Sequence, residues 1–323
     1  MNSGNANEGE AILNTDWMSQ LPTELHSLPL FELALPGSHD SMSYDLDINS
    51  SIIEPDGLKK FSKIYCVRKI IKSWAITQEE PITKQLDAGA RYFDLRIARK
   101  PKDPIPTRLY FYHGLYTRTD VETALRNIND WASMHPKEIL ILSFSHFEGF
   151  DSQIKGKLHD HLISFIKTLF GTKLVNTSSS LTLKSCWDQN KNVIVSYDYP
   201  TSQHPEIWGK IPYYYGDSMD PIKVESRLDQ ALQKERPSKW FFVCGLNLTL
   251  PGDSRALKYI LRPFDNLPSV THRSLPKLLE WLKQESRKTS VNIVASDLVT
   301  ADNFVPTIIE FNMKHVLEQH VSF

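Results

Sequence analysis

Two histidines, His39 and His113, each lie where turn residues meet a strand-like run. His39 follows the turn sequence Pro-Gly-Ser, and His113 ends the run Leu109–His113 directly before a glycine. Between them along the chain, Arg96 closes another strand-like run. Imidazoles act as base and acid near neutral pH, and a guanidinium stabilises charge on phosphoryl oxygens. These residues could therefore carry out acid–base phosphoryl transfer without a metal ion, provided that they meet in space.

Three aspartates accompany these side chains. Asp40 directly follows His39, and Asp94 lies two residues before Arg96, on the same face of a strand. An unpaired charge on an apolar strand is costly, so Arg96 needs a partner, and Asp94 can serve in a purely structural way. Asp297 follows the last strand-like run. Taken singly, each of these residues fits a structural role, but together they favour one catalytic site.

The elements that must position these residues alternate between strands and helices. The runs typical of strands buried on both faces are Phe31–Leu35, Ala90–Ile97, Leu109–Tyr112, Glu138–Phe144, Val193–Tyr197, Trp240–Leu246 and Asn292–Ala295. The helical patterns are Val121–Trp131, with Asp120 as N-cap, and Ile154–Phe170, Leu275–Leu282 and Phe304–Leu317. This alternation predicts an α/β fold, a TIM-type (β/α) barrel with mostly parallel strands and some irregularity.

A barrel would bring the five polar groups His39, Asp40, Arg96, His113 and Asp297 to one place. In such folds active sites lie at the carboxyl ends of the strands. The first and last strands of a barrel are neighbours, so Asp297 could reach His39. His146, just past a strand end, is a weaker candidate. The sequence shows no zinc-ligand spacing, no phosphate-binding glycine loop and no nucleophile elbow.

Length and composition are those of an ordinary globular protein. The chain has 323 residues, 23% of them charged, with a net charge of −1, which gives no general attraction to nucleic acid. Residues 1–15 are predicted to be a disordered tail, and residues 16–323 a single barrel domain. With no signal sequence, no apolar run of membrane-spanning length and no paired cysteine motif, we expect a reduced, cytoplasmic monomer.

Three motifs together resemble one family. Pro36–Asp40 reads Pro-Gly-Ser-His-Asp, Gly89–Arg96 reads Gly-Ala-Arg-Tyr-Phe-Asp-Leu-Arg, and Tyr112–Gly114 reads Tyr-His-Gly. Their order and spacing resemble the X region of phosphatidylinositol-specific phospholipase C, from about Trp17 to the final helix. The chain is most similar to the small single-domain X-domain proteins of animals.

This superfamily contains two designs. The large eukaryotic enzymes use calcium and carry Asn after the first histidine and Glu-x-Asp on the second strand, whereas bacterial enzymes carry Asp and Asp-x-Arg. Asp40 and the Asp94–Arg96 run match the bacterial pattern, and Ser145 stands where the calcium enzymes carry a further Glu. A guanidinium in place of calcium would repel the ion. The resemblance therefore implies catalysis without calcium or any other cofactor.

The resemblance also implies a reaction on an inositol phospholipid. His39 would take the proton of the inositol 2-hydroxyl, Arg96 would stabilise the phosphoryl charge, and His113 would protonate the departing diacylglycerol oxygen. Asp297 would orient His39, and Asp40 would hydrogen-bond on the phosphate side. The products are diacylglycerol and inositol 1,2-cyclic phosphate, which water opens slowly.

The residues expected to contact the inositol ring depart from the bacterial pattern. The bacterial enzymes have Lys near the position of Ser145 and Arg near that of Asp198. The run Tyr213–Tyr215 could supply a ring that stacks on inositol, with Tyr215 as first choice and Tyr213 as second. Alternatively, this run only forms an aromatic rim of the barrel.

The segment Gly57–Trp74 could meet a membrane. It holds six basic residues and no acid, and Ile64, Val67, Ile71 and Trp74 recur at helical spacing. A basic amphipathic helix near the mouth suits peripheral docking on anionic lipid. The alternative is an ordinary outer helix with a solvated face.

Two other functions remain open. One is a catalytically weak or silent inositol-lipid-binding protein on the same fold, which the altered ring contacts favour and the intact pair of histidines disfavours. The other is a glycerophosphodiester phosphodiesterase, whose carboxylate-built metal site and His-Arg-Gly motif are missing, because this chain has His-Asp-Ser at 39–41.

Overall fold

A computed structural model describes residues 14–54, 59, 63–178, 180–201, 203–262, 264–286 and 290–321. Of the tail predicted to be disordered, residues 1–13 lie outside the described residues. The described chain opens with the short 3-10 helices Asn14–Asp16, Met18–Gln20, Thr23–Ser27 and Leu30–Glu32; Ser43–Asp45, Gly171–Lys173 and Ser254–Ala256 are also 3-10 helical.

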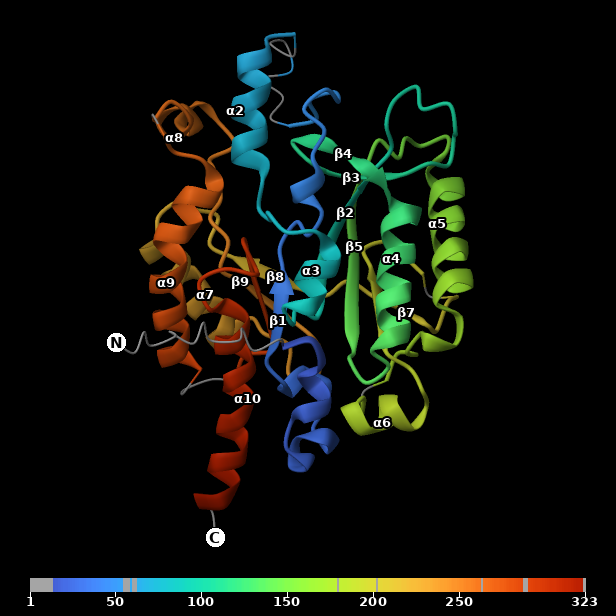
Figure 1. The fold of residues 1–323 in the computed structure, drawn as a ribbon, viewed down its shortest axis with the longest axis vertical. Coiled ribbons are helices and arrows are strands. Elements are labelled where there is room, and N and C mark those ends of the chain that lie inside the picture. Colours follow the sequence, from blue (N-terminus) through green and yellow to red (C-terminus); the bar gives the residue numbers. More distant parts are fainter. Residues whose placement is uncertain are drawn as a thin grey trace, which may run out of the picture.

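The centre of the molecule is a ten-stranded sheet, in which every pairing is parallel except those made by β3 and β4 (Figure 1). The strands are β1 Leu35–Ser38, β2 Tyr92–Ala98, β3 Tyr110–His113, β4 Leu115–Asp120, β5 Leu140–Glu148, β6 Val193–Tyr197, β7 Ile207–Trp208, β8 Tyr213–Tyr215, β9 Val243–Gly245 and β10 Ile293–Ser296. Their order is β7-β6-β5-β2-β1-β10-β9-β8. The predicted α/β barrel class is confirmed, as a curled sheet whose end strands β7 and β8 do not pair within the described residues.

Helices surround this sheet (Figure 1). They are α2 Tyr65–Ala75, α3 Ile82–Asp87, α4 Val121–Met134, α5 Lys155–Phe170, α6 Leu183–Asp188, α7 Pro221–Lys234, α8 Leu257–Ile260, α9 Leu267–Glu285 and α10 Phe304–Val321. Helices α2 and α8 lie at one end of the sheet, and α6 lies near the other (Figure 1). Helix α4 begins where the sequence predicts, because the Asp120 carboxylate accepts a hydrogen bond from the Thr123 backbone N–H at 2.9 Å.

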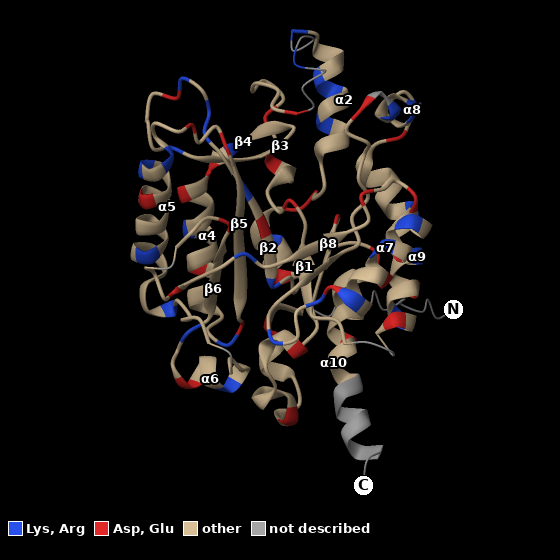
Figure 2. Ribbon diagram, turned by 180° about the vertical axis from the view of Figure 1, so that it is seen from behind, with Lys and Arg blue, Asp and Glu red and all other residues tan. Residues whose placement is uncertain are grey.

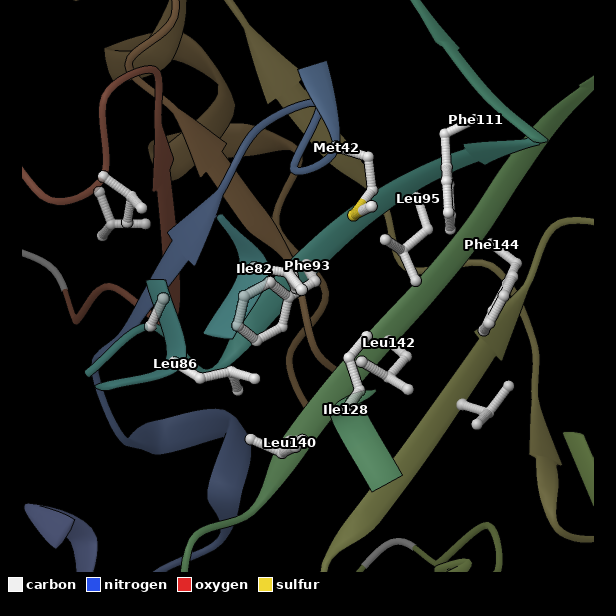
Figure 3. Close-up of a cluster of buried hydrophobic side chains, with 14 of the residues drawn as sticks. Met42, Ile82, Leu86, Phe93, Leu95, Phe111, Ile128, Leu140, Leu142 and Phe144 are labelled. Atoms are coloured by element: carbon white, nitrogen blue, oxygen red, sulfur yellow. The ribbon is translucent and has the colours of Figure 1, made fainter. Parts of the chain in front are cut away.

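Side-chain alternation along β2 shows how one strand serves both core and site. Phe93, Leu95 and Ile97 point outward into the hydrophobic layer under the helices, part of which Figure 3 shows. Tyr92 packs in the second core, inside the curled sheet, and Asp94 and Arg96 follow it at the period of two that strand geometry requires. The apolar face therefore anchors the strand while its other face carries charge toward the mouth.

The first and last strands are neighbours, as the sequence predicts. Leu35 pairs with Ile293, and Ser38 pairs with Ser296. Gly37 is needed in this pairing, because a Cβ there would lie 3.0 Å from the Tyr92 ring. The residues that directly follow β1 and β10 are thus delivered side by side.

Several predicted boundaries are wrong. The run Phe31–Leu35 opens with the end of the 3-10 helix Leu30–Glu32, and β1 begins only at Leu35. The run Trp240–Leu246 shortens to Val243–Gly245, and β4, β7 and β8 were not predicted. The run Leu109–Tyr112 is a strand, but it belongs to an antiparallel hairpin attached to β2 and not to the parallel barrel.

Candidate active site

The contact between His39 and Asp297 organises the site. The two residues directly follow the paired strands β1 and β10, and His39 Nδ1 lies 2.7 Å from Asp297 Oδ1. Arg96 Nη2 lies 2.9 Å from His39 Nε2. Because a carboxylate accepts and a guanidinium donates, neutral His39 carries its proton on Nδ1 and keeps a lone pair on Nε2. That lone pair is what a general base needs.

Arg96 is held between two carboxylates. Its Nε lies 2.6 Å from Asp40 Oδ1 and 3.3 Å from Asp94 Oδ2. Asp40 reaches this position because the chain turns sharply after β1, with a φ of +42° at Asp40, a conformation that aspartate tolerates. The Asp40 backbone N–H also donates to Asp94 Oδ2 at 3.2 Å. The guanidinium is therefore fixed in orientation at the mouth.

The sequence predicts His113 at the end of a barrel strand, but an antiparallel hairpin carries it in the structure. It ends β3, in the hairpin that folds over the mouth, and its Nε2 lies 3.5 Å from Asp40 Oδ2. Its Nδ1 donates to the backbone carbonyl of Ala75 at 2.7 Å. The ring centroids of His39 and His113 are 6.4 Å apart. The two imidazoles thus meet in one site beside Arg96.

Burial and neighbouring charge set the protonation states. Burial lowers the pKa of His39, but the Asp40 charge and the hydrogen bond to Asp297 outweigh it, so this pKa lies above its usual value. Burial raises the pKa of Asp40, but Arg96 and the two histidines overcome it and hold that pKa below the usual range. The site therefore contains ionised Asp40, a charged Arg96 and a histidine whose pKa lies above the usual value.

Ser145 and Asp198 lie along the same rim. Ser145 is in register with Arg96 on the neighbouring strand β5, and Asp198 directly follows β6. Asp198 forms an ion pair with Lys210 at 2.7 Å, so a cation does stand at this rim, on a residue that the sequence comparison did not single out. Neither residue contacts the two histidines in the described structure.

Of the two candidate tyrosines, Tyr213 is the nearer to the catalytic groups. Its ring centroid lies 5.9 Å from that of His39, and its hydroxyl donates to Asn247 Oδ1 at 2.9 Å. Tyr215 lies two residues further along β8. This residue is 42% exposed, and its ring centroid lies 6.2 Å from that of Tyr213. The structure therefore favours Tyr213 for contact near the base, and Tyr215 for the outer rim.

His146, the weaker candidate, lies in the electrostatic reach of the site. Partial burial and the Arg96 charge lower its pKa, and its backbone has a φ of +69°. Residues that sequence reasoning missed include Tyr112, which lines a small cleft with Arg96, and the pair Thr77 and Gln78 behind His39. No motif marked them, because their roles depend on contacts between distant segments.

The carboxylates at the site do not suit a resident cation. Within the described part of the chain, His39, Asp40 and Asp94 place one ligand atom each within 4.8 Å of one another, close enough to hold a metal. However, Arg96 Nε already lies against both carboxylates. A divalent ion there would face a fixed guanidinium at contact distance, which repels it.

Fold and site together define a class: an α/β-barrel protein whose mouth brings together two histidines and a fixed guanidinium. The family model for phosphatidylinositol-specific phospholipase C, X domain, matches residues 62–198. The chain is 40% identical over 293 residues to PI-PLC X domain-containing protein 1 of Danio rerio, covering 88% of this chain and 91% of that protein. The human protein of the same name is 36% identical over 313 residues, covering 93% of each. The chain belongs to the PI-PLC X domain-containing protein family.

Solved structures agree with the fold. A structure of the S. aureus phosphatidylinositol-specific phospholipase C covers 93% of this chain and 98% of its own, with a TM-score of 0.65 and 17% identity. The enzyme of Listeria monocytogenes gives a TM-score of 0.61 at 19% identity, covering 93% of this chain and 99% of its own. At these identities the likeness shows a shared barrel fold.

Proposed function

We propose that this protein is a phosphoinositide-specific phosphodiesterase of the phospholipase C type, which cleaves inositol phospholipid to diacylglycerol and inositol phosphate without a metal ion. One observation carries the proposal: His39, bound to Asp297, and His113 stand in one mouth with Arg96 between carboxylates beside them. Family membership supports the same substrate class. It also leaves the glycerophosphodiester alternative without support.

The proposed mechanism moves two protons, one at each histidine. His39 Nε2 takes the proton of the inositol 2-hydroxyl while that oxygen bonds to phosphorus, and Arg96 stabilises the charge on the phosphoryl oxygens. The bond from phosphorus to the diacylglycerol oxygen breaks, and protonated His113 supplies the proton from Nε2. Since Ala75 accepts from Nδ1 and Asp40 faces Nε2, both nitrogens of charged His113 have an acceptor. Water then opens the cyclic phosphate with the two histidine roles exchanged.

The test is turnover of phosphatidylinositol vesicles, with and without chelator. Replacement of His39 or His113 by alanine is expected to lower kcat by about 10²–10⁴-fold each, the usual contribution of a general acid or base. His272→Ala is the matched control, because His272 also contacts a carboxylate, Asp302 at 2.8 Å, but at the surface. Activity that survives both catalytic substitutions would refute the mechanism, and chelator-sensitive activity would refute metal independence.

A binding protein without turnover is the second candidate. It is favoured by the rim, where Ser145 is neutral and the Lys210 charge is balanced by Asp198. Under this alternative, wild-type protein binds vesicles that contain phosphatidylinositol, releases no diacylglycerol, and binds equally well after His113→Ala. The vesicle assay above separates the two functions.

We also propose that α2 contacts an anionic membrane. The part of the predicted segment 57–74 that the structure describes is residue 59 and residues 63–74. Ile71 and Trp74 are buried and hold α2 to the protein, so lipid contact falls to the exposed Ile64 and Tyr65 at its start. Figure 2 shows basic and no acidic residues on α2, and Figure 1 places α2 and α8 at the end of the barrel where the mouth opens.

Vesicle co-sedimentation tests this contact. The double substitution Lys63→Gln and Lys69→Gln removes two exposed charges of this surface, and each basic residue near an anionic surface contributes about 1 kcal/mol to binding. We expect roughly tenfold or greater loss of affinity for phosphatidylglycerol vesicles. Lys137→Gln with Lys184→Gln, two exposed lysines elsewhere, is the control of equal charge. Equal binding by both double variants would refute the proposal.

In the described residues no helix is long and apolar enough to cross a bilayer. The cytoplasmic location and the monomeric state stay predictions.

A further inference from the structure

Residues 75–78, the last residue of α2 and the three that follow it, contact both histidines of the site. The Ala75 carbonyl accepts the hydrogen bond from His113 Nδ1 at 2.7 Å. This contact leaves Nε2 as the only ring nitrogen of His113 that faces the reacting groups. A backbone carbonyl thus selects which nitrogen of the proposed acid carries the mobile proton.

Two residues further on, Thr77 and Gln78 hold the backbone of His39. The Thr77 hydroxyl lies 3.0 Å from the carbonyl oxygen of His39 and 3.2 Å from that of Asp40. Gln78 Nε2 donates to the His39 carbonyl at 2.9 Å, and also to the Ser296 carbonyl at 2.9 Å. Gln78 therefore ties the residue that carries the base to the residue before Asp297.

The chain on the other side of Asp297 is held by the same segment. The Leu298 N–H donates to the Thr77 carbonyl at 2.7 Å, and the Val299 N–H donates to Gln78 Oε1 at 2.9 Å. Thr77 and Gln78 are each only 1% exposed. Buried hydrogen bonds of this kind are expensive to break, so they restrict movement. Both sides of Asp297 are consequently fixed relative to His39.

We propose that residues 75–78 form a positioning segment for catalysis, in which Gln78 and Thr77 set the geometry of the His39–Asp297 pair and the Ala75 carbonyl sets the tautomer of His113. The proposal rests on the function proposed above. Because Thr77 and Gln78 are buried behind His39, we expect their effect in the chemical step and not in substrate binding. Misplacement of a catalytic group by about 1 Å can cost about 10²-fold in rate.

Paired substitutions separate positioning from simple loss of stability. Gln78→Met keeps size and removes every polar contact of the side chain. The control Asn192→Leu does the same to a buried side chain that donates to the Ala132 and His135 carbonyls, at the start of β6. We expect Gln78→Met to lower kcat about 10- to 100-fold with little change in KM and to move the acid limb of the pH profile. Asn192→Leu is expected to lose comparable thermal stability while kcat stays within about threefold of wild type.

The Thr77 pair adds a rescue. Thr77→Val should reproduce the loss of kcat, and Thr77→Ser, which keeps the hydroxyl, should restore it to within about threefold of wild type. Equal kcat losses in Gln78→Met and Asn192→Leu, or failure of serine to rescue, would overturn the proposal. If Gln78→Met does not fold, the Thr77 pair decides.

Nitrogen-15 NMR of the histidine rings judges the proposal without turnover. In wild type the neutral His113 ring is expected to carry its proton on Nδ1. Thr77→Val is expected to shift the titration midpoint of His39, and Asn192→Leu to leave it unchanged. Unchanged His39 titration in Thr77→Val would count against positioning. If wild type turns over no phosphatidylinositol, the proposed enzyme function fails, while this measurement still tells whether the segment positions the rings.

Discussion

At the scale of single residues, the site shows how one contact converts ordinary side chains into a base. His39 alone is a buried histidine, and Asp297 alone could cap the turn that follows β10. Their 2.7 Å contact places the proton of the neutral ring on Nδ1. Arg96 Nη2, 2.9 Å from Nε2, donates to the lone pair on that nitrogen. Arg96 can give up this contact when a phosphate arrives, because phosphate is the better acceptor for a guanidinium. In the proposed mechanism, His39 is thus already in the tautomer that a general base needs.

Asp297→Asn tests this assignment through pH. The Asp40 charge and Asp297 hold the pKa of His39 above its usual value, and the base must be neutral to act, so activity falls as pH drops through that pKa. Removing the Asp297 charge lowers this pKa, so the acid limb of kcat/KM should move to lower pH. We expect kcat itself to fall about 10³–10⁴-fold, because an amide no longer fixes the tautomer.

The pH profile is measured from about pH 5 to 9, with Asp302→Asn as control. Asp302 contacts the ring of His272 at the surface in the same way that Asp297 contacts His39. The control should keep the wild-type profile. An acid limb that stays in place in Asp297→Asn would show that Asp297 does not tune the base.

These residues can be predicted from the sequence because they act through their side chains. Residues that act through backbone groups cannot be predicted in this way. Strand alternation places Asp94 beside Arg96, and the closing rule of barrels places Asp297 beside His39. The Ala75 carbonyl carries no side-chain signal at all. The order of Tyr213 and Tyr215 relative to the base depends on how the short edge strand β8 is rotated, and three residues show too little periodicity to reveal that.

At the scale of elements, the hairpin β3–β4 carries His113, the proposed acid, into the site. His113 is carried by a strand outside the parallel sheet, so its position depends on the hairpin turn and on α2, against which the turn packs. Gly114 lies at this junction, with a φ of +70°. A Cβ there would lie 3.4 Å from Ala75 Cβ, the Glu54 carbonyl and the Ile71 side chain. The turn is therefore fitted closely to the helix.

Gly114→Ala should move the acid without touching the base. The left-handed backbone conformation costs an alanine about 1–2 kcal/mol, and the contacts with α2 must open by a few tenths of an ångström. We expect kcat to fall about tenfold or more, with a small rise in KM. In the control Gly156→Ala, in α5, the added Cβ meets nothing within 4 Å. That variant should gain about 0.5–1 kcal/mol in the free energy of unfolding. An unchanged kcat in Gly114→Ala would show that the hairpin does not set the position of His113.

At the scale of the whole molecule, the curled sheet is sealed at the end opposite the mouth by the segment that precedes β1. A buried pair fixes this seal: Arg91 Nη2 lies 2.6 Å from Glu138 Oε2, and both side chains have no exposed surface. The backbone N–H groups of Met18 and Ser19 donate to the Glu138 carboxylate at 3.2 Å each. Arg91 donates to the Thr15 carbonyl at 2.6 Å. This one ion pair therefore joins the start of β2, the start of β5 and the chain that leads into β1.

Glu138→Gln is the sharpest test of this seal, because it keeps the shape and removes only the charge. It leaves Arg91 buried without a counter-ion, which typically costs about 3–5 kcal/mol in the free energy of unfolding. Urea denaturation measures that loss, and proteolysis of the native protein should show earlier cleavage before β1. The control Asp188→Asn breaks the exposed i,i+4 pair with Lys184, worth about 0.3–0.5 kcal/mol. Because the mouth lies at the other end of the strands, Glu138→Gln should keep its kcat at temperatures where it stays folded. A loss of stability no larger than that of the control would show that the seal rests on the apolar packing of the leading segment and not on the ion pair.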